Sequence, residues 1–479
     1  MRYKIKPVWY LLIGIIVMFA THLTYSVDLM AWVSSVPFLI YLSITNGWQS
    51  RLLFILALVI AWSLCVFKIL SPPMPAIMIF LFSVPISLFH LPAYLLWDTF
   101  KKHKWSAFLF PATLVFMEWL QYTFTPFASW GVAAYTQSHS LILMQSVSLF
   151  GMAGLSFLIY WVNISITEIA IHRKTSLQTF QIPLAVLLIL VIFGALRYDI
   201  SKSKGTNTIT VAAVGTDSEV SGLPLPSKEN SEKVNGILFE RTSVAAKNNV
   251  ALVVWNEAAT FILPEDESMW KDSLYSLSSR LKISLVASYV VPVSIAPLKY
   301  ENKYLFIDSN GVIVSTYHKH QPVPGEPSKK GNEPLQVFDV AGTKIGGAIC
   351  YDYDFPYLAK RFGKLNADIV AVPSSDWRGI DPLHSRMAAF RAIEQGHSIL
   401  RSTRFGNSAA ITPYGEIISQ MSSFDNNDRI MLAHLPVRGI KTFYAVIGDS
   451  FVFGCIGFII FFIINSSRNK HRNPEPKFL

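Results

Sequence analysis

Charged residues are scarce in this chain. Only 15% of its 479 residues are Asp, Glu, Lys or Arg, whereas 52% are hydrophobic. A soluble globular protein normally has about 25% charged residues. The composition therefore excludes an ordinary soluble protein and indicates a membrane protein.

Cysteine is also scarce, with only three residues, so the sequence offers no disulfide framework. Two of them, Cys65 and Cys455, lie in apolar runs, where a small apolar thiol is ordinary. The third, Cys350, stands alone in a more polar region. If that region is extracytoplasmic, a lone thiol there is either buried and inert or reactive.

Long apolar runs recur along the chain. A helix needs about 20 residues to cross the ~30 Å hydrocarbon core of a bilayer. The basic start before the first run resembles a cleaved leader peptide, but we expect a retained span, since removing it would disturb the charge alternation described next. We expect eight spans, near residues 8–26, 28–45, 52–70, 75–97, 105–124, 143–171, 180–197 and 445–465.

Lysine and arginine alternate between the connections. Residues 71–75 and 125–140 contain neither, whereas residues 1–6, 101–104 and the C-terminal tail are basic. The positive-inside rule then places both termini in the cytoplasm and the region between spans seven and eight on the outer side of the cytoplasmic membrane. We expect three parts: a seven-span domain (1–197), an extracytoplasmic domain (198–444), and the eighth span with its basic tail (445–479).

The net charge of +10 resides in the cytoplasmic segments, because residues 198–444 are nearly balanced in charge. The basic character therefore indicates no nucleic-acid partner.

Short β-branched and apolar runs alternate with amphipathic segments over 198–444, which predicts a layered α/β domain. A hairpin turn is expected at Asn310-Gly311. The expected helices are 226–248, 265–282 and 384–396, the last ended by Gly396. The expected strands are 208–215, 251–255, 283–291, 303–308, 311–317, 344–350, 368–373, 397–402 and 408–413.

Three of these strands end in polar residues: Glu257, Lys319 and Cys350. Sites in open α/β sheets assemble at the carboxyl ends of strands. A thiol with a pKa of about 8.5 is mostly protonated at neutral pH, so it needs a base such as Glu257. Lys319 and the Tyr351 N–H are candidate donors to the oxyanion that forms when the thiol attacks an ester or amide carbonyl. The product would be a thioester on Cys350.

The segments "VVWNEAA", "YHKHQPVPGE" and "AICYDYDFP", in that order, resemble the signatures of the nitrilase (carbon–nitrogen hydrolase) superfamily. Eight spans around such a domain, together with "MEWLQ" and "ASWGVAAYTQ", resemble the apolipoprotein N-acyltransferases. This resemblance implies an α-β-β-α sandwich in which Glu257 is the general base, Lys319 the oxyanion residue and Cys350 the acylated nucleophile. It also implies supporting roles for Glu326, Tyr351 and Asp352, the last of which stands where the family usually has Glu.

The implied reaction transfers a fatty acyl chain from a membrane phospholipid to Cys350, and then to the N-terminal amine of a diacylglyceryl-modified apolipoprotein. It requires no metal or cofactor, and we expect a monomer. Two alternatives remain: a membrane-tethered amidase acting on a small amide, and a catalytically vestigial scaffold.

Several other residues have a functional and a structural interpretation. Trp255 is a candidate pocket-lining residue, and Ser374 and Trp377 either border the pocket or only cap and pack. His318 and His320 flank Lys319, but two histidines do not make a full metal-ligand set. For Arg386, Arg391, Arg401 and Arg404, salt bridges are favoured over a phosphate-binding stripe.

Overall fold

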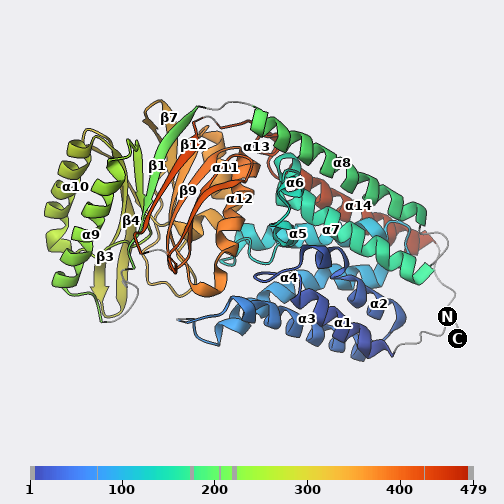
Figure 1. The fold of residues 1–479 in the computed structure, drawn as a ribbon. Helices are drawn as coiled ribbons and strands as arrows, with labels where there is room; N and C mark the ends of the chain where they lie inside the picture. The colour runs from blue at the N-terminus through green and yellow to red at the C-terminus, as the bar shows by residue number, and fades with distance from the viewer. Residues whose placement is uncertain are drawn as a thin grey trace. The chain divides into compact units, whose positions relative to one another are not determined.

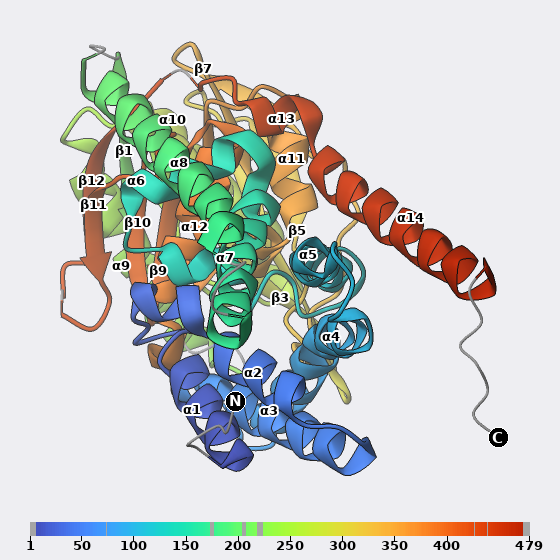
Figure 2. The same ribbon diagram turned by 90° about the vertical axis from the view of Figure 1, so that its right-hand side faces the viewer.

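The computed structural model describes residues 6–72, 74–172, 177–203, 207–217, 224–425, 427–437 and 439–472. The chain forms two compact units. One comprises Met1–Leu70, Pro75–Ala195 and Ile447–Leu479, and the other Ser71–Met74 and Leu196–Val446. Figures 1 and 2 show the first unit as helical and the second as built around β-sheets.

The helical unit is a bundle whose sequential helices pack side by side, as α4 and α5 do in both views (Figures 1 and 2). Short 3-10 helices occur at Asp28–Val33 and Ala133–Gln137. The α-helices are α1 (Pro7–Phe19), α2 (Val36–Ile44), α3 (Trp48–Ile69), α4 (Met78–Phe100), α5 (Ser106–Phe124), α6 (Leu141–Met144), α7 (Val147–His172), α8 (Leu177–Ser203, which continues into the second unit) and α14 (Ser450–Arg472).

Four helical segments among the described residues are long and apolar enough to cross a membrane: Trp48–Ile69, Met78–Phe100, Val147–Ile171 and Phe180–Ile200. The segments Pro7–Phe19, Asp28–Ile44 and Ser450–Ser466 are apolar but shorter. The structure therefore shows a membrane protein with several apolar helices, and the set of eight spans stays a prediction.

Buried polar side chains cross-link this bundle. Asn163 on α7 accepts a hydrogen bond from the Ser35 N–H (2.8 Å) and donates to the Ala31 carbonyl (2.8 Å). Glu118 on α5 accepts from the Ala133 N–H (2.9 Å) and the Tyr160 hydroxyl (2.8 Å). Since little water reaches such positions, paired polar groups join neighbouring helices in a specific register.

The second unit contains two six-stranded mixed sheets. Their orders are β12-β1-β2-β3-β4-β5 and β11-β10-β9-β8-β7-β6, and each has three adjacent parallel strands flanked by antiparallel ones. The strands are β1 (Thr208–Val214), β2 (Leu252–Trp255), β3 (Ser284–Ile295), β4 (Leu298–Ile307), β5 (Ile313–His318), β6 (Val337–Val340), β7 (Thr343–Gly347), β8 (Ile369–Ser375), β9 (Ser398–Arg404), β10 (Asn407–Ile411), β11 (Ile417–Ser422) and β12 (Ile430–Pro436).

The sheets pack face to face, and helices cover their outer faces. Along β1, Val211 and Ala213 point into the core between the sheets, while Ala212 and Val214 point into the layer beneath α9 (Lys228–Ala246) and α10 (Glu267–Leu281). This alternation is the period-two pattern of a strand buried on both faces. Helices α11 (Pro356–Lys364) and α12 (Leu383–Gln395) lie beside the other sheet (Figure 1).

The three helices expected in this unit are present within two residues of their predicted ends. Gly396 ends α12 in the left-handed conformation (φ +71°), where a Cβ would collide with the Ile440 carbonyl. A positive φ at Gly311 makes the predicted hairpin turn. Helix α11 and strands β6, β11 and β12 were not predicted from the sequence.

Candidate active site

The three polar residues at strand ends come from both sheets. Glu257 follows β2 and Lys319 follows β5, while Cys350 opens a 3-10 turn (Cys350–Asp354) shortly after β7. All three side chains are buried, with exposures of 3%, 1% and 4%. The facing sheets therefore bring together residues that are far apart in sequence.

Lys319 lies between two carboxylates. Its Nζ donates to Glu257 Oε1 at 2.7 Å and to Glu326 Oε2 at 2.7 Å. Asn302, on β4, also joins the two glutamates, since its Nδ2 donates to Glu257 Oε1 (2.7 Å) and to Glu326 Oε1 (3.1 Å). Asn302 was not predicted, because a single amide in a strand has no sequence signature.

Cys350 sits on a sharp turn. Its φ of +45° is in the left-handed region, which costs a non-glycine residue roughly 1–2 kcal/mol. Its Sγ lies 3.5 Å from the Ser375 carbonyl oxygen at the end of β8 and donates to it. This backbone geometry resembles a nucleophile elbow, in which the side chain projects from a strand-to-helix turn.

Asp352 holds this turn in place. Its carboxylate accepts hydrogen bonds from the Ile349 N–H (3.0 Å), the Tyr317 hydroxyl (2.8 Å) and the Gln321 N–H (2.6 Å). Burial raises the pKa of Asp352 to about 7, although Lys319 and these donors oppose the rise. These contacts position the Cys350 turn, and the supporting catalytic role of Asp352 stays a prediction.

The charges of the site act on the thiol. Burial and then the Glu257 carboxylate raise the pKa of Cys350 well above its usual value, and Lys319 only partly opposes them. Burial also tends to raise the pKa of Glu257, but Lys319 and Asn302 outweigh it and leave that pKa below its usual value. At neutral pH the site therefore pairs a protonated thiol with an ionised carboxylate, which is the starting state for general-base activation.

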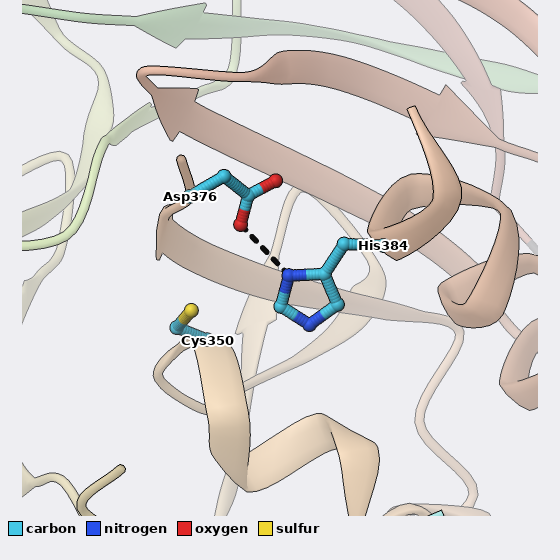
Figure 3. Close-up of side chains that lie close together, drawn as sticks. All are labelled: Cys350, Asp376 and His384. Carbon is cyan, nitrogen blue, oxygen red and sulfur yellow. Dashed lines mark hydrogen bonds and ion pairs between the residues drawn. The ribbon is translucent and has the colours of Figure 1, made fainter. Parts of the chain in front are cut away.

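A second buried charge cluster lies beside Cys350 (Figure 3). His384, on α12, bonds Asp376 through Nδ1 (2.7 Å) and Asp354 through Nε2 (2.8 Å). Arg401 on β9 donates to both oxygens of Asp376, at 2.9 and 2.7 Å. The cluster was not predicted from sequence: its residues are spread over 48 positions, and only the salt-bridge interpretation of Arg401 pointed toward it.

The potential ligand atoms of Cys350, Asp376 and His384 lie within 4.8 Å of one another. Both imidazole nitrogens already face carboxylates. Burial lowers the pKa of His384, but Asp354 and Asp376 outweigh it and raise that pKa to about 9. A protonated imidazole has no lone pair to give a metal, so the contacts favour a charge network that fixes the end of the Cys350 turn.

This network predicts a pH-dependent stability. Because the pKa of His384 is about 9 in the folded state and 6.5 when unfolded, its contribution is complete below pH 6.5 and is lost as the pH rises through 9. The linkage amounts to about 3 kcal/mol. We expect the unfolding temperature of the purified protein to fall between pH 6.5 and 9.

His384→Gln should remove most of that fall. Asp352 acts in a lower pH range, because its pKa is raised to about 7 and its contribution is lost as the pH rises through 7. A wild-type unfolding temperature that stays constant from pH 6.5 to 9 would contradict the assignment.

Of the remaining predicted residues, some lie next to the site and Trp255 does not. The expectation that Trp255 lines the pocket is wrong: its side chain lies in the layer under α9 and donates to Thr242 Oγ1 (2.9 Å), because strand alternation turns it to the outer face. Ser374 is buried, and its carbonyl accepts from the Glu257 N–H (3.2 Å), which fixes the backbone at Glu257. Trp377 is half-buried at the end of β8, and Tyr351 is buried with its ring edge-on to Phe355.

Two neighbouring groups complete the site. Arg404, on β9, donates from Nε to Ser375 Oγ (2.9 Å) and from a terminal nitrogen to the Ala258 carbonyl (3.3 Å), so it links the loops beside the base and the thiol. His318 bonds Glu333, and His320 stacks on Tyr317 with ring centroids 4.6 Å apart.

Two packed mixed sheets with Glu, Lys and Cys at their strand ends define a domain of the carbon–nitrogen hydrolase type. The family model for carbon–nitrogen hydrolases matches residues 205–443, and the model for the apolipoprotein N-acyltransferase N-terminal domain matches residues 14–165. The chain belongs to the apolipoprotein N-acyltransferase family of the carbon–nitrogen hydrolase superfamily, as the sequence motifs indicated.

Individual relatives are distant. The chain is 26% identical to an apolipoprotein N-acyltransferase of Borreliella burgdorferi over 366 residues, covering 67% of this chain and 68% of the relative. It is 25% identical to one of Rickettsia typhi over 378 residues, covering 72% and 75%. Among solved structures, an amidase from Nesterenkonia sp. superposes with a TM-score of 0.40 at 15% identity, covering 50% of this chain and 93% of the amidase.

Proposed function

We propose that this protein transfers a fatty acyl chain from a membrane phospholipid, through a thioester on Cys350, to the N-terminal amine of the lipidated cysteine of apolipoproteins. The proposal rests on one observation. The Lys319 ammonium forms ion pairs with both Glu257 and Glu326, next to the buried Cys350 thiol. Membership of the acyltransferase family supports it at the level of reaction class.

In the first half-reaction, the Glu257 carboxylate takes the thiol proton while Sγ attacks the phospholipid ester carbonyl. The negative charge that forms on oxygen is stabilised by the Lys319 ammonium, with the Tyr351 N–H as a second donor. Collapse of the intermediate breaks the ester C–O bond. The lysophospholipid alkoxide leaves with the proton from Glu257, and the acyl group stays on sulfur.

In the second half-reaction, the α-amine of the apolipoprotein attacks the thioester carbonyl. Glu257 accepts the amine proton and returns it to the departing thiolate, which leaves an amide and the free enzyme. The buried site excludes bulk water, so it favours transfer to an amine over hydrolysis.

The membrane arrangement is part of the same proposal. We propose seven spans before the catalytic domain and one after it, with both termini in the cytoplasm and Cys350 on the outer side of a bacterial cytoplasmic membrane. The basic connections support this orientation. Both substrates are membrane lipids, so we expect each of them to reach the catalytic domain from the outer leaflet of the bilayer.

Intact-mass measurement tests the proposal. After incubation with phosphatidylethanolamine, the purified protein is expected to gain one fatty-acyl mass that hydroxylamine removes. A diacylglyceryl lipopeptide with a free α-amine should discharge this adduct, whereas the same lipopeptide with an acetylated amine should not.

Discharge at equal rates with both lipopeptides would mean that water is the acceptor, as in an amidase. A folded protein that forms no adduct with any phospholipid would indicate the amidase acting on a small amide or the vestigial scaffold. Either result overturns the acyltransferase proposal.

A further inference from the structure

A cavity of about 760 Å³ lies in the helical unit, where the 101–105 connection joins α4 to α5. Trp97 and Lys101 to Lys104 line it, as do Trp161, Ser165 and Glu168 of α7. Ser43 and Ile182 are also among the lining residues. None of these residues belongs to the candidate active site. The cavity is therefore a candidate for a second, separate binding site.

The cavity is rich in positive charge. Lys101, Lys102 and Lys104 line it, together with His103, against the single carboxylate of Glu168. Lys101 is held by the Leu42 carbonyl (2.6 Å) and by Asp98 (2.9 Å). Among the described residues, neither Lys102 nor Lys104 forms an ion pair, so their charges are available to an anion.

Two polar atoms in the lining lack a hydrogen-bond partner among the described residues: the indole Nε1 of Trp97 and the hydroxyl of Ser43. Trp97 is 99% buried. A buried donor without an acceptor costs free energy, so such groups normally have a partner. Both atoms have almost no surface open to the cavity as it stands, so the oxygens of an occupant would reach them only through a small movement of the lining side chains.

Much of the remaining lining is apolar or aromatic, including Ala107, Phe108, Trp161 and Ile171. A phospholipid matches both parts of this lining. Its phosphate oxygens can accept hydrogen bonds from the lysine and indole donors, and its apolar portion can pack against the aromatic side. Basic pockets between membrane helices are known to bind anionic headgroups.

We propose that this cavity binds the phosphodiester headgroup of an anionic phospholipid, at a site separate from the one that supplies the acyl chain. Its assignment to the cytoplasmic leaflet rests on the orientation proposed above. The binding itself rests only on the residues that line the cavity.

The test is native mass spectrometry of the full-length protein released from nanodiscs that contain equal amounts of phosphatidylglycerol and phosphatidylcholine. Wild type is expected to retain phosphatidylglycerol in preference to phosphatidylcholine. Lys102→Ser with Lys104→Ser should lower that preference roughly ten-fold. Trp97→Phe, which keeps a ring but removes the N–H donor, should lower it roughly five-fold. A control pair on the exposed surface of the other unit, Lys299→Ser with Lys344→Ser, should leave it unchanged.

Equal retention of both lipids by wild type, or a preference that the cavity variants do not change, would overturn the proposal. Displacement of phosphatidylglycerol by millimolar inorganic phosphate would show that the site recognises free phosphate and would also overturn it. If the lysine pair does not fold, Trp97→Phe decides. These readouts do not depend on acyl transfer, so failure here and failure of the proposed function are distinguishable.

Discussion

Cys350→Ala is expected to abolish acyl transfer, lowering the rate on the order of 10⁴-fold or more. The reason is chemical: without the sulfur there is no atom to carry the acyl group between the two lipid substrates. The alanine variant should also show no hydroxylamine-sensitive mass increase with phosphatidylethanolamine. Intact-mass analysis and a lipopeptide acylation assay measure the two effects.

The other two thiols provide matched controls. Cys65 and Cys455 are buried in α3 and α14 of the helical unit. Cys65→Ala and Cys455→Ala should therefore keep both the adduct and the transfer rate within about two-fold, since a small buried thiol acts mainly as a packing group. An adduct that persists in Cys350→Ala would place the acyl group elsewhere and refute the assignment of Cys350.

Glu257→Gln is expected to lower the rate of thioester formation by about 10²- to 10⁴-fold. Glutamine retains the shape and an acceptor oxygen for Lys319 and Asn302, so the variant removes the base with little change in packing. The pH profile should change as well. Wild type, whose base has a lowered pKa, needs no thiolate at neutral pH, whereas the variant depends on the ionisation of a thiol whose pKa is raised.

The residual rate of Glu257→Gln should therefore climb with pH across the whole range in which the protein stays folded. Single-turnover acylation, followed by intact mass at several pH values, measures this slope. Glu301→Gln is the control, because Glu301 lies next to Asn302 in sequence but pairs with Lys303 at 2.8 Å, outside the site. If Glu257→Gln and wild type had equal rates and parallel pH profiles, Glu257 would not be the base.

The local sequence pattern was sufficient to predict many of the strands and helices of the α/β unit. Val211 and Ala213 alternate with Ala212 and Val214 on a strand, and Gly396 ends a helix, because both features depend on residues near in sequence. Glu257, Lys319 and Cys350 stood out because each polar residue follows an apolar strand. The structure places them in one buried region and leaves their catalytic roles to the experiments above.

Long-range features were not predictable in the same way. Asn302 joins two glutamates 24 and 45 positions away, and His384 lies between Asp354 and Asp376 although the three sit on separate elements. Trp255 was misassigned, since its position next to the base in sequence does not show which face of the strand it occupies.

The sequence by itself therefore determined the class of protein. Its low content of charged residues indicates a membrane protein, and Glu257, Lys319 and Cys350 follow one another in the order found in the carbon–nitrogen hydrolases. The tertiary structure alone decided the electrostatics of the site, because a pKa depends on burial and on charges that only folding brings near. It holds the Cys350 turn between Asp352 and the His384 network, and it sets the basic 101–104 connection against α7 to form a cavity.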